Sequence, residues 1–277
     1  AHSSAPSPIS AMLSGVLIKA AGIYVLIRLF FNMFVFNYEI ALVITVLGTL
    51  SMVAGSLLAI VQWDLKRLLA YSSISQIGYV VMAFGMGILL LLKGNNEAAA
   101  ILAIGGGIYH MINHAVFKGL LFLNAGSIEH RLDTRNLKDM GGLSRAMPVT
   151  STTSFMASMS ISGIPPFNGF FSKLVIIIAA INGRFYLLAA LAVIVSIITL
   201  AYFLKFQRYA FFNKTPGQAV QKIREVPFPM SFSMIVLAIL CLALSLLAIP
   251  SVSEVVLRPA IDVLMQSELY STSILGI

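Results

Sequence analysis

Long runs of apolar residues, separated by short polar stretches, make up most of this chain of 277 residues. Each run reaches about 20 residues, which is the length that an α-helix needs to cross the hydrocarbon core of a bilayer. Because no water is available in that core, a chain that crosses it forms helices, which satisfy their own backbone hydrogen bonds. The pattern predicts an all-α, polytopic membrane protein with about seven transmembrane helices. The predicted helices are residues 9–31, 39–62, 66–92, 98–128, 148–182, 184–208 and 229–250.

The fifth run, residues 148–182, is too long for one straight crossing and contains the sequence SISGIPPFNGF. Pro165 has no backbone N–H and disfavours helix at the residue before it, and Pro166 does the same to Pro165. We therefore expect a broken helix, with its break at 162–167. Helix packing alone can produce such a kink, but discontinuous helices also mark ion sites in transporters. Lys173 lies about two turns beyond the break, which favours the functional interpretation.

Hydrophobic residues make up 59% of the chain and charged residues 10%, and the mean hydropathy is +0.95. This composition excludes an ordinary soluble domain. The single cysteine, Cys241, excludes an intrachain disulfide, and the lack of a cysteine cluster argues against an iron–sulfur site, so we expect no cofactor in this chain. Residues 1–10 lack the basic stretch of a cleavable signal peptide. They read as a loop that follows an earlier membrane span, so we expect a further segment to precede them.

The net charge of +8 could indicate a nucleic-acid partner, but the basic residues are spread over loops, and membrane topology explains them better. If the loops alternate sides, one side carries eleven basic residues: Lys66, Arg67, Arg131, Arg135, Lys138, Arg145, Lys205, Arg208, Lys214, Lys222 and Arg224. The other side carries four: Arg28, Lys93, Arg184 and Arg258. Cytoplasmic loops hold the excess of lysine and arginine, so loops 62–67, 129–147 and 205–228 are predicted on the cytoplasmic side. The stretch after residue 250 is predicted as an interfacial helix.

Five basic side chains lie inside the predicted spans. His110, His114 and Lys118 are spaced four apart in GGGIYHMINHAVFKGLLFLNAG, and they share one helical face because each step advances about 40°. Lys19 and Lys173 have equally apolar surroundings. An ionisable residue inside a membrane indicates a functional site by default. Packing of the histidines against carbonyls and snorkelling of the lysines are the alternatives, but Lys19 and Lys118 are far from a membrane boundary.

Protons are the cargo that fits these side chains best. Burial and neighbouring like charges disfavour the charged form of a base, so that it can release and rebind a proton near neutral pH. Sodium prefers carboxylate or carbonyl oxygens, and the acidic residue nearest to the spans is Asp64, at the inner edge. A metal ion on the two histidines would lack a carboxylate or thiolate ligand and would be repelled by Lys118. Bases spread along the chain also suit a relay better than a pocket for an anionic solute.

Several segments resemble, in the same order, the antiporter-like subunit family: LSGVLIKAAGIYVLIRLF, QWDLKRLLAYSSISQIGYV, HMINHAVFKGLLFLNAGSI, LKDMGGL and SISGIPPFNGFFSK. That family includes the proton-pumping membrane subunits of respiratory complex I, the matching subunits of membrane-bound hydrogenases and the large subunits of Mrp-type sodium/proton antiporters. The resemblance implies a fold of two inverted five-helix repeats, of which this chain is the C-terminal half. Residues 1–38 would hold the last helix of the first repeat, 39–208 the second repeat, and 209–277 an inner loop, a final transmembrane helix and a tail.

The resemblance also implies roles for individual residues. A proton relay would use Lys19, His110, His114, Lys118 and Lys173. Within it, Lys19 would connect two half-channels, and Lys173 on the broken helix would pass the ion outward. Supporting residues would be Asp64 and Lys66, as the acidic and basic pair that opens the next helix, and Pro165 and Pro166 at the break.

The family's first repeat carries a buried Glu paired with a Lys, and both would precede Ala1. The resemblance therefore implies obligate partner subunits in the membrane, one of which supplies the missing repeat. We expect a proton-translocating subunit without an active site of its own, embedded in the lipid bilayer of an energy-transducing prokaryotic cytoplasmic membrane. Its complex would be redox-driven, such as NADH:quinone oxidoreductase or a membrane-bound hydrogenase, with electron transfer in the partners. The alternatives are an Mrp-type sodium/proton antiporter without redox partners, an anion transporter and a purely structural spacer.

Overall fold

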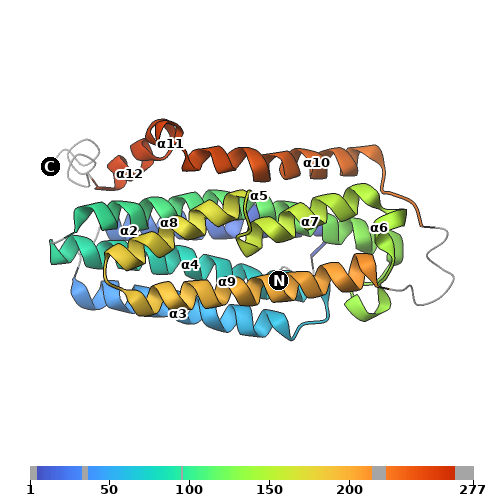
Figure 1. The fold of residues 1–277 in the computed structure, drawn as a ribbon, viewed down its shortest axis with the longest axis horizontal. Coiled ribbons are helices and arrows are strands. Elements are labelled where there is room, and N and C mark those ends of the chain that lie inside the picture. The colour runs from blue at the N-terminus through green and yellow to red at the C-terminus, as the bar shows by residue number, and fades with distance from the viewer. Residues whose placement is uncertain (1–4, 33–36, 95, 214–222, 266–277) are drawn as a thin grey trace.

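The fold is a bundle of long helices that run side by side along the long axis of the molecule (Figure 1). The structure, a computed structural model, describes residues 5–32, 37–94, 96–213 and 223–265. Two basic residues predicted for the cytoplasmic side, Lys214 and Lys222, lie outside these ranges. Within the described ranges every regular element is a helix, and one isolated bridge joins Asp64 to Asn136.

Five of the described helices are long and apolar enough to cross a membrane on their own. They are α3 (Tyr38–Ile60), α4 (Leu65–Lys93), α5 (Glu97–Leu132), α9 (Tyr186–Gln207, continued by the π-helix η3, Arg208–Phe212) and α10 (Phe228–Ala243, continued by the 3-10 helix η5, Leu244–Ala248). The first predicted span is helical in three consecutive pieces, α1 (Ser7–Met12), the π-helix η1 (Leu13–Leu17) and α2 (Ile18–Asn32). The fifth forms two helices, α7 (Pro148–Ser162) and α8 (Asn168–Asn182). The prediction of an all-α membrane protein with a broken helix is confirmed.

Short helices occupy the connections at the two ends of the bundle. Between α5 and α7 lie the 3-10 helix η2 (Leu137–Asp139) and α6 (Leu143–Ala146). After α10 the chain forms α11 (Pro250–Val256) and α12 (Arg258–Met265). These short elements leave the long helices to form the membrane-embedded body.

The described parts of the three loops that were predicted on the cytoplasmic side meet at one end of the bundle, here called the inner end. The Leu65 N–H donates to the Arg135 carbonyl at 2.9 Å, which joins the first of these loops to the second. Arg131 Nη2 donates to the Glu225 carbonyl at 2.5 Å, which joins the second to the third. The loops that were predicted together therefore lie together.

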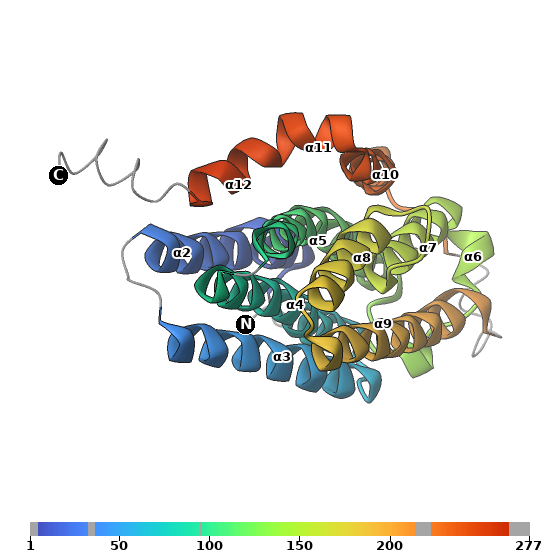
Figure 2. The ribbon, with the colours of Figure 1, turned by 60° about the vertical axis from the view of Figure 1, so that its left-hand side comes forward.

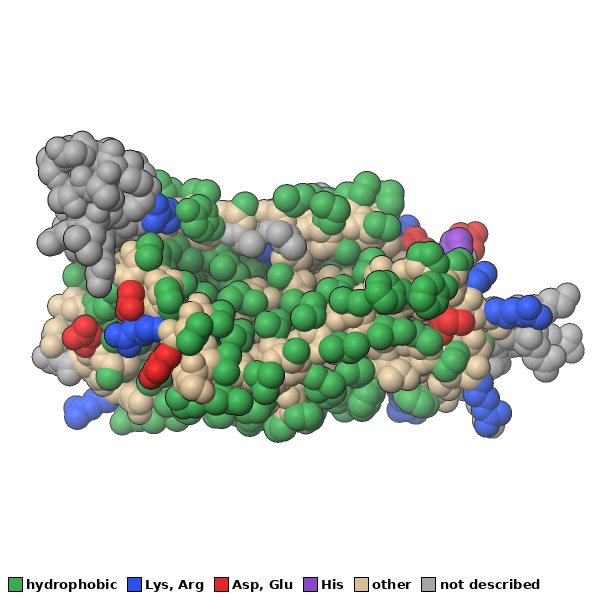
Figure 3. Space-filling model, turned by 90° about the horizontal axis from the view of Figure 1, so that it is seen from above, with side chains coloured by type: hydrophobic (Ala, Val, Ile, Leu, Met, Phe, Trp, Pro, Cys, Tyr) green, Lys and Arg blue, Asp and Glu red, His purple; other side chains and the backbone are tan. Residues whose placement is uncertain are grey.

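The opposite end, here called the outer end, holds the turns after α4 and α8. Asn96 Nδ2 donates to the Asn182 carbonyl at 2.9 Å, and the Lys93 ammonium lies 5.2 Å from the centre of the Phe185 ring. Charged side chains gather at the two ends, and hydrophobic side chains dominate the surface between them (Figure 3). This distribution is the one expected of a body whose middle contacts lipid or apolar partners.

Helices α3 and α4 approach each other more closely than side chains would allow. The contact is made by glycines, Gly48 and Gly55 from α3 and Gly78 and Gly85 from α4. A Cβ atom placed on any of the four would lie within 2.7 Å of a backbone nitrogen of the facing helix. Small residues let helix backbones touch in membranes, where packing has to replace the hydrophobic effect as the force between helices.

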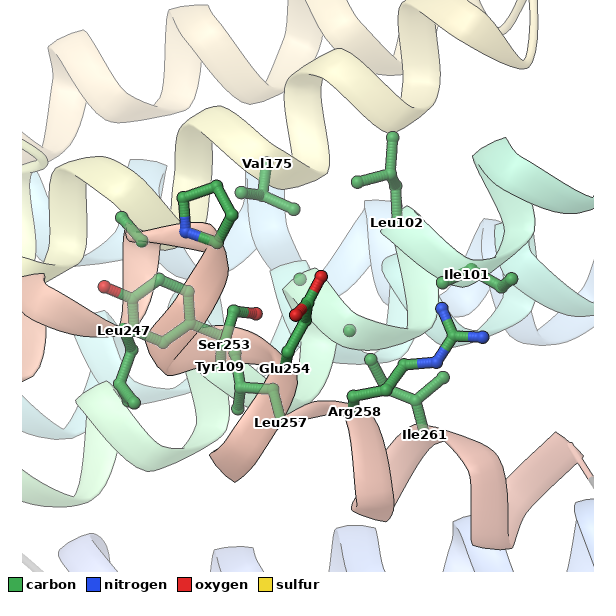
Figure 4. Close-up of a pocket in the computed structure, with 14 residues that line it drawn as sticks. Ile101, Leu102, Tyr109, Val175, Leu247, Ser253, Glu254, Leu257, Arg258 and Ile261 are labelled. Carbon is green, nitrogen blue, oxygen red and sulfur yellow. The ribbon is translucent and has the colours of Figure 1, made fainter.

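Helices α10 to α12 lie outside the bundle. α10 packs against α5 and α7, and α11 and α12 bend across the outer end toward α2 and α5 (Figures 1 and 2). A hollow of about 310 Å³ separates α11 and α12 from α5 and α8, and Ser253, Glu254 and Arg258 project toward it (Figure 4). On α12, Ile261 and Leu264 are buried and Arg258 is exposed. This two-sided pattern suits a helix at the membrane surface, as the sequence predicted.

We expect Gly78→Ala to destabilise the fold, because the new Cβ would lie 2.3 Å from the Met52 nitrogen and force α3 away from α4. Such overpacking costs about 1–3 kcal/mol. The matched control is Gly22→Ala on α2, since a Cβ there meets nothing within 4 Å. Thermal unfolding of the detergent-solubilised proteins measures the difference. Equal midpoints for the two variants would contradict close α3–α4 packing as a source of stability.

Candidate functional site

Helix α5 carries His110, His114 and Lys118 through the interior of the bundle. The four-residue spacing puts all three on one face, and each residue is at most 1% exposed. The Phe117 ring packs beside both histidines, with its centroid 6.0 Å from that of His110 and 5.6 Å from that of His114. The hydrogen-bond partners of this face come from α4 and α8.

His110 lies between α4 and α8. Its Nε2 is 3.2 Å from Gln76 Oε1 on α4, and its Nδ1 is 2.9 Å from Ser172 Oγ on α8. With the Gln76 carbonyl as acceptor, Nε2 carries the proton, and the neutral ring accepts from the Ser172 hydroxyl at Nδ1. His110 thus has an acceptor function that faces the broken helix.

His114 sits among other bases. Its Nε2 is buried and has no hydrogen-bond partner among the described protein atoms. The charges of Lys19, Lys118 and His110 all act on its ring. A buried ring nitrogen is normally satisfied, so a protein-bound water or a neighbouring proton carrier is needed here.

Lys118 is fully buried, yet its ammonium has polar partners on α4. Nζ donates to the Leu69 carbonyl at 2.9 Å and to Ser72 Oγ at 2.5 Å. Lys19, on α2, is half-buried and close enough for its charge to act on Lys118 as well as on His114. The two lysines therefore oppose each other's protonation, since neither is in an ion pair with a described carboxylate.

Lys173 lies directly against the helix break. Nζ donates to the Ile161 carbonyl at 2.8 Å, in the last turn of α7, and lies 4.9 Å from the centre of the Tyr79 ring. The residue is 3% exposed, and its charge acts on His110. A carbonyl freed by the end of α7 is thus a partner of this ammonium, as expected for a broken helix at membrane depth.

Two asparagines fix the break against α5. Asn168 Nδ2 donates to Asn113 Oδ1 at 2.9 Å, and Asn113 Nδ2 donates to the Asn168 carbonyl at 3.0 Å. The Ser160 hydroxyl donates to Asn168 Oδ1. A Cβ on Gly169 would lie 1.9 Å from the Ser160 carbonyl oxygen, so only glycine allows α7 and α8 to cross this closely.

The two prolines form the break but do not reach the bases. Pro165 and Pro166 are exposed and are joined by a cis peptide bond. The Pro166 carbonyl accepts a hydrogen bond of 2.7 Å from Ser245 Oγ, which follows α10. Their contribution is to end α7 and to hold the break near the outer segment of the chain.

Asp64 and Lys66, predicted as a pair, have separate partners. Asp64 is the N-cap of α4 and accepts from the Arg67 N–H at 2.8 Å. Lys66 is 2% exposed and pairs with Glu129 at 2.7 Å. Asp64 points to the helix start because its carboxylate satisfies an N-terminal N–H there, so it cannot serve as the counter-charge of Lys66.

Sequence reasoning missed the neutral partners of the bases, which are Gln76, Asn113, Asn168 and Ser172, and it missed Glu129. Asn113 stands next to His114 in the same motif, and Asn168 follows the two prolines closely. Polar residues in apolar runs were therefore the available signal. The role of the five bases in moving protons stays a prediction.

Nothing in the described ranges gathers three or more His, Cys, Asp or Glu side chains into a group that could hold a metal ion. Cys241 is a free, buried thiol on α10. The arrangement can hold, release and transfer protons, because its members are bases and hydroxyls within reach of one another.

Comparison with known proteins agrees with this arrangement. The family model described as NADH:quinone oxidoreductase/Mrp antiporter, TM matches residues 1–199. A large Na(+)/H(+) antiporter polypeptide of Bacillus subtilis (strain 168) is 34% identical over 270 residues, which cover 93% of this chain and 33% of that protein. This chain therefore spans about a third of the length of that relative.

Two solved structures share the fold. A chain of the Mrp complex from Dietzia sp. DQ12-45-1b superposes with a TM-score of 0.83 at 26% identity, over 97% of this chain and 55% of that chain. A chain of the membrane-bound sulfane sulfur reductase, an archaeal respiratory membrane complex, gives a TM-score of 0.75 at 34% identity, over 88% and 40% respectively. The predicted resemblance is confirmed. Because the family model matches most of its length, this chain belongs to the NADH:quinone oxidoreductase/Mrp antiporter transmembrane family.

Proposed function

We propose that this chain is the C-terminal half of a proton-translocating, antiporter-like membrane subunit. The observation that carries the proposal is a series of bases inside the bundle, in the order Lys19, Lys118, His114, His110 and Lys173. Each member acts electrostatically on the next, and none pairs with a described carboxylate. A buried base without a counter-ion favours its neutral form, so a proton placed on one member is readily passed to the next.

The first transfers take place between the lysines and His114. Protonated Lys118 is held by the Leu69 carbonyl and Ser72 Oγ. A second proton on Lys19 raises the cost of that charge, because both ammonium groups lie in a poorly screened interior. The proton on Lys118 then moves to His114, whose Nε2 has no competing partner among the described protein atoms. Water between these groups would shorten each step.

The next transfers involve His110 and the hydroxyl of Ser172. A proton that reaches His110 Nδ1 turns this acceptor into a donor, so the Ser172 hydroxyl must stop donating to it. The hydroxyl has other acceptors within reach, the carbonyls of Asn168 at 3.4 Å and Gly169 at 3.3 Å. Its reorientation leaves Ser172 Oγ to accept from the imidazolium, next to Lys173 in the chain.

Lys173 is the last member and faces a way out of the bundle. It lines a hollow of about 190 Å³ between α7, α8 and α9, together with Ser162 and Ser196. Opening of the Ile161 contact would turn the ammonium toward this hollow. We propose that the proton leaves from there toward the outer side, and that the inner end faces the cytoplasm of a prokaryotic cell.

The chain works, on this proposal, with other membrane subunits, one of which supplies the first repeat. The similar chains come from multi-subunit membrane complexes, and this chain spans only part of its relatives. A redox-driven complex would place electron transfer in partners and leave this chain without a cofactor. An Mrp-type sodium/proton antiporter is the second candidate, favoured by the 34% identity to the B. subtilis protein.

Lys118→Ala should abolish proton translocation by the assembled complex in proteoliposomes, because the variant interrupts the series at its centre. General acid–base groups contribute about 100-fold or more to proton transfer, so the rate should fall to the background of empty vesicles. The matched control is Lys93→Ala at the exposed outer end, which should keep the normal rate. Normal translocation by Lys118→Ala would contradict the relay and favour a spacer role, and saturable uptake of an anion instead of protons would favour a solute transporter.

Identification of every polypeptide that co-purifies with this chain separates the two candidate complexes. We expect several membrane subunits, including one with the missing repeat, because the described bases form only part of a path. Subunits with flavin, nickel or iron–sulfur sites would indicate the redox-driven complex, and membrane subunits alone would indicate the Mrp-type antiporter. Mass spectrometry of the native assembly provides the measurement, and a chain that purifies alone and pumps would refute the need for a partner.

A further inference from the structure

A hollow of about 670 Å³ opens at the inner end, where α1, α4 and the end of α5 meet. Ala5, Ser7, Lys66 and Glu129 are among the residues that line it. It is the most polar of the hollows described above, and the five bases do not line it. We call it the inner vestibule.

Glu129 sits at the boundary between the vestibule and the protein interior. Its Oε2 accepts from Lys66 Nζ at 2.7 Å and from Ser7 Oγ at 3.2 Å, and its Oε1 lies 3.4 Å from Arg135 Nε. The Glu129 side chain is 30% exposed, whereas that of Lys66 is 3% exposed. The carboxylate is therefore open to inner water while its cationic partner lies behind it.

Three serines continue inward from Glu129 along the first helical segment. Ser7, Ser10 and Ser14 recur at intervals of three and four, so they share one face, and all are buried. They cover about 10 Å along the helix axis. Ser10 Oγ donates to the Ala5 carbonyl at 3.1 Å, and that carbonyl also accepts from Lys66 Nζ at 3.1 Å. The start of the series is thus bonded to the ion pair.

The inner end of this series meets the partners of Lys118. Ser14 Oγ is 3.0 Å from Ser73 Oγ on α4. Ser73 and its neighbour Ser72 both donate to the Leu69 carbonyl, at 3.0 and 2.9 Å, and Lys118 Nζ donates to Ser72 Oγ. The hydroxyls therefore connect the vestibule with the central base of the proposed relay.

The backbone is irregular at the point where the two helices meet. Ser14 lies in the π-helix Leu13–Leu17, and single π-turns inside α-helices frequently occur at functional sites. The adjacent Gly15 allows close contact with α5, since a Cβ there would lie 3.0 Å from the Ala115 carbonyl oxygen. The irregular turn and the glycine together bring Ser14 within reach of α4.

We infer that Glu129 is the site where protons from the inner side bind, and that Ser7, Ser10, Ser14, Ser73 and Ser72 lead them to Lys118. The inference rests on the proposed function, because Lys118 is its end point. A proton from inner water forms an O–H bond on the Glu129 carboxylate and weakens the pairing with Lys66. Each hydroxyl then accepts one proton and donates one, with water where two hydroxyls are too far apart, so neutral Lys118 gains a proton and the hydroxyls rotate back.

Several charged or titratable groups surround Glu129 and will set its response to pH. They are Lys66 from α4, and His130, Asp133 and Arg135 from the end of α5 and the loop that follows; α1 contributes the Ser7 hydroxyl. Lys66 and Arg135 stabilise the ionised carboxylate. Proton uptake at this site should therefore become limiting when inner protons are scarce.

The test measures proton translocation by the assembled complex in proteoliposomes as a function of inner pH. Glu129→Gln should lower the rate at least about tenfold at high inner pH and remove most of its dependence on inner pH, while the response to outer pH is kept. The control is Asp133→Asn, which changes an exposed carboxylate in the same vestibule. A wild-type pH profile for Glu129→Gln would overturn the inference.

Ser14→Ala tests the path without touching the ion pair, in case the loss of Glu129 impairs folding. It should slow translocation severalfold, because it removes one hydroxyl from the middle of the series. Ser56→Ala is the matched control, since Ser56 is equally buried on α3 and donates to its own helix, to the Val53 carbonyl at 2.8 Å. Equal rates for the two serine variants would overturn the path.

Lys118→Ala separates failure of this inference from failure of the proposed function. If Lys118→Ala abolishes translocation at every pH while Glu129→Gln and Ser14→Ala behave like their controls, the relay stands and the inner path is wrong. If Lys118→Ala translocates normally, the proposed function is wrong, and the inner path fails with it.

Discussion

The placement of positive charge inside an apolar bundle, without carboxylates beside it, is the constraint on which the structure depends. A lysine at the centre of a membrane helix costs about 2.5–3.5 kcal/mol on insertion scales. Lys118 and Lys173 reduce that cost with backbone carbonyls, those of Leu69 and Ile161, and with a serine hydroxyl. These partners are neutral acceptors, so they stabilise an ammonium without locking it as a fixed ion pair. A base held in this way can still lose its proton.

The helix architecture supplies the neutral acceptors. The end of α7 exposes the Ile161 carbonyl to Lys173, and the Asn113–Asn168 pair keeps the two halves of the broken helix in register with α5. On the other side, the glycine contacts between α3 and α4 fix α4, which carries Gln76, Leu69 and Ser72 toward α5. Membrane helices gain little from burial against each other. Close glycine packing and paired amides therefore have to set the distances between the proton-carrying groups.

The helical spans and the shared face of His110, His114 and Lys118 could be predicted, because both follow from local spacing along the chain. The break near Pro165 could be predicted for the same reason. The pairing of Lys66 with Glu129 could not, since the two residues lie on different helices and only the packing of α4 against α5 brings them together. Nearness in sequence suggested Asp64 instead, whose carboxylate is used by the helix start. Ser172 and Gln76 were missed because a single polar residue in an apolar run does not reveal which helix it faces.

The relay requires water or rotating side chains between groups that do not touch directly, above all around His114 Nε2, which has no partner among the described protein atoms. An experimental structure of the assembled complex that resolves ordered water would test this requirement most directly. The account predicts water molecules within hydrogen-bonding distance of His114 Nε2 that connect it to Lys118 and to His110. Tight apolar packing around His114, with no water between it and either neighbour, would contradict the account.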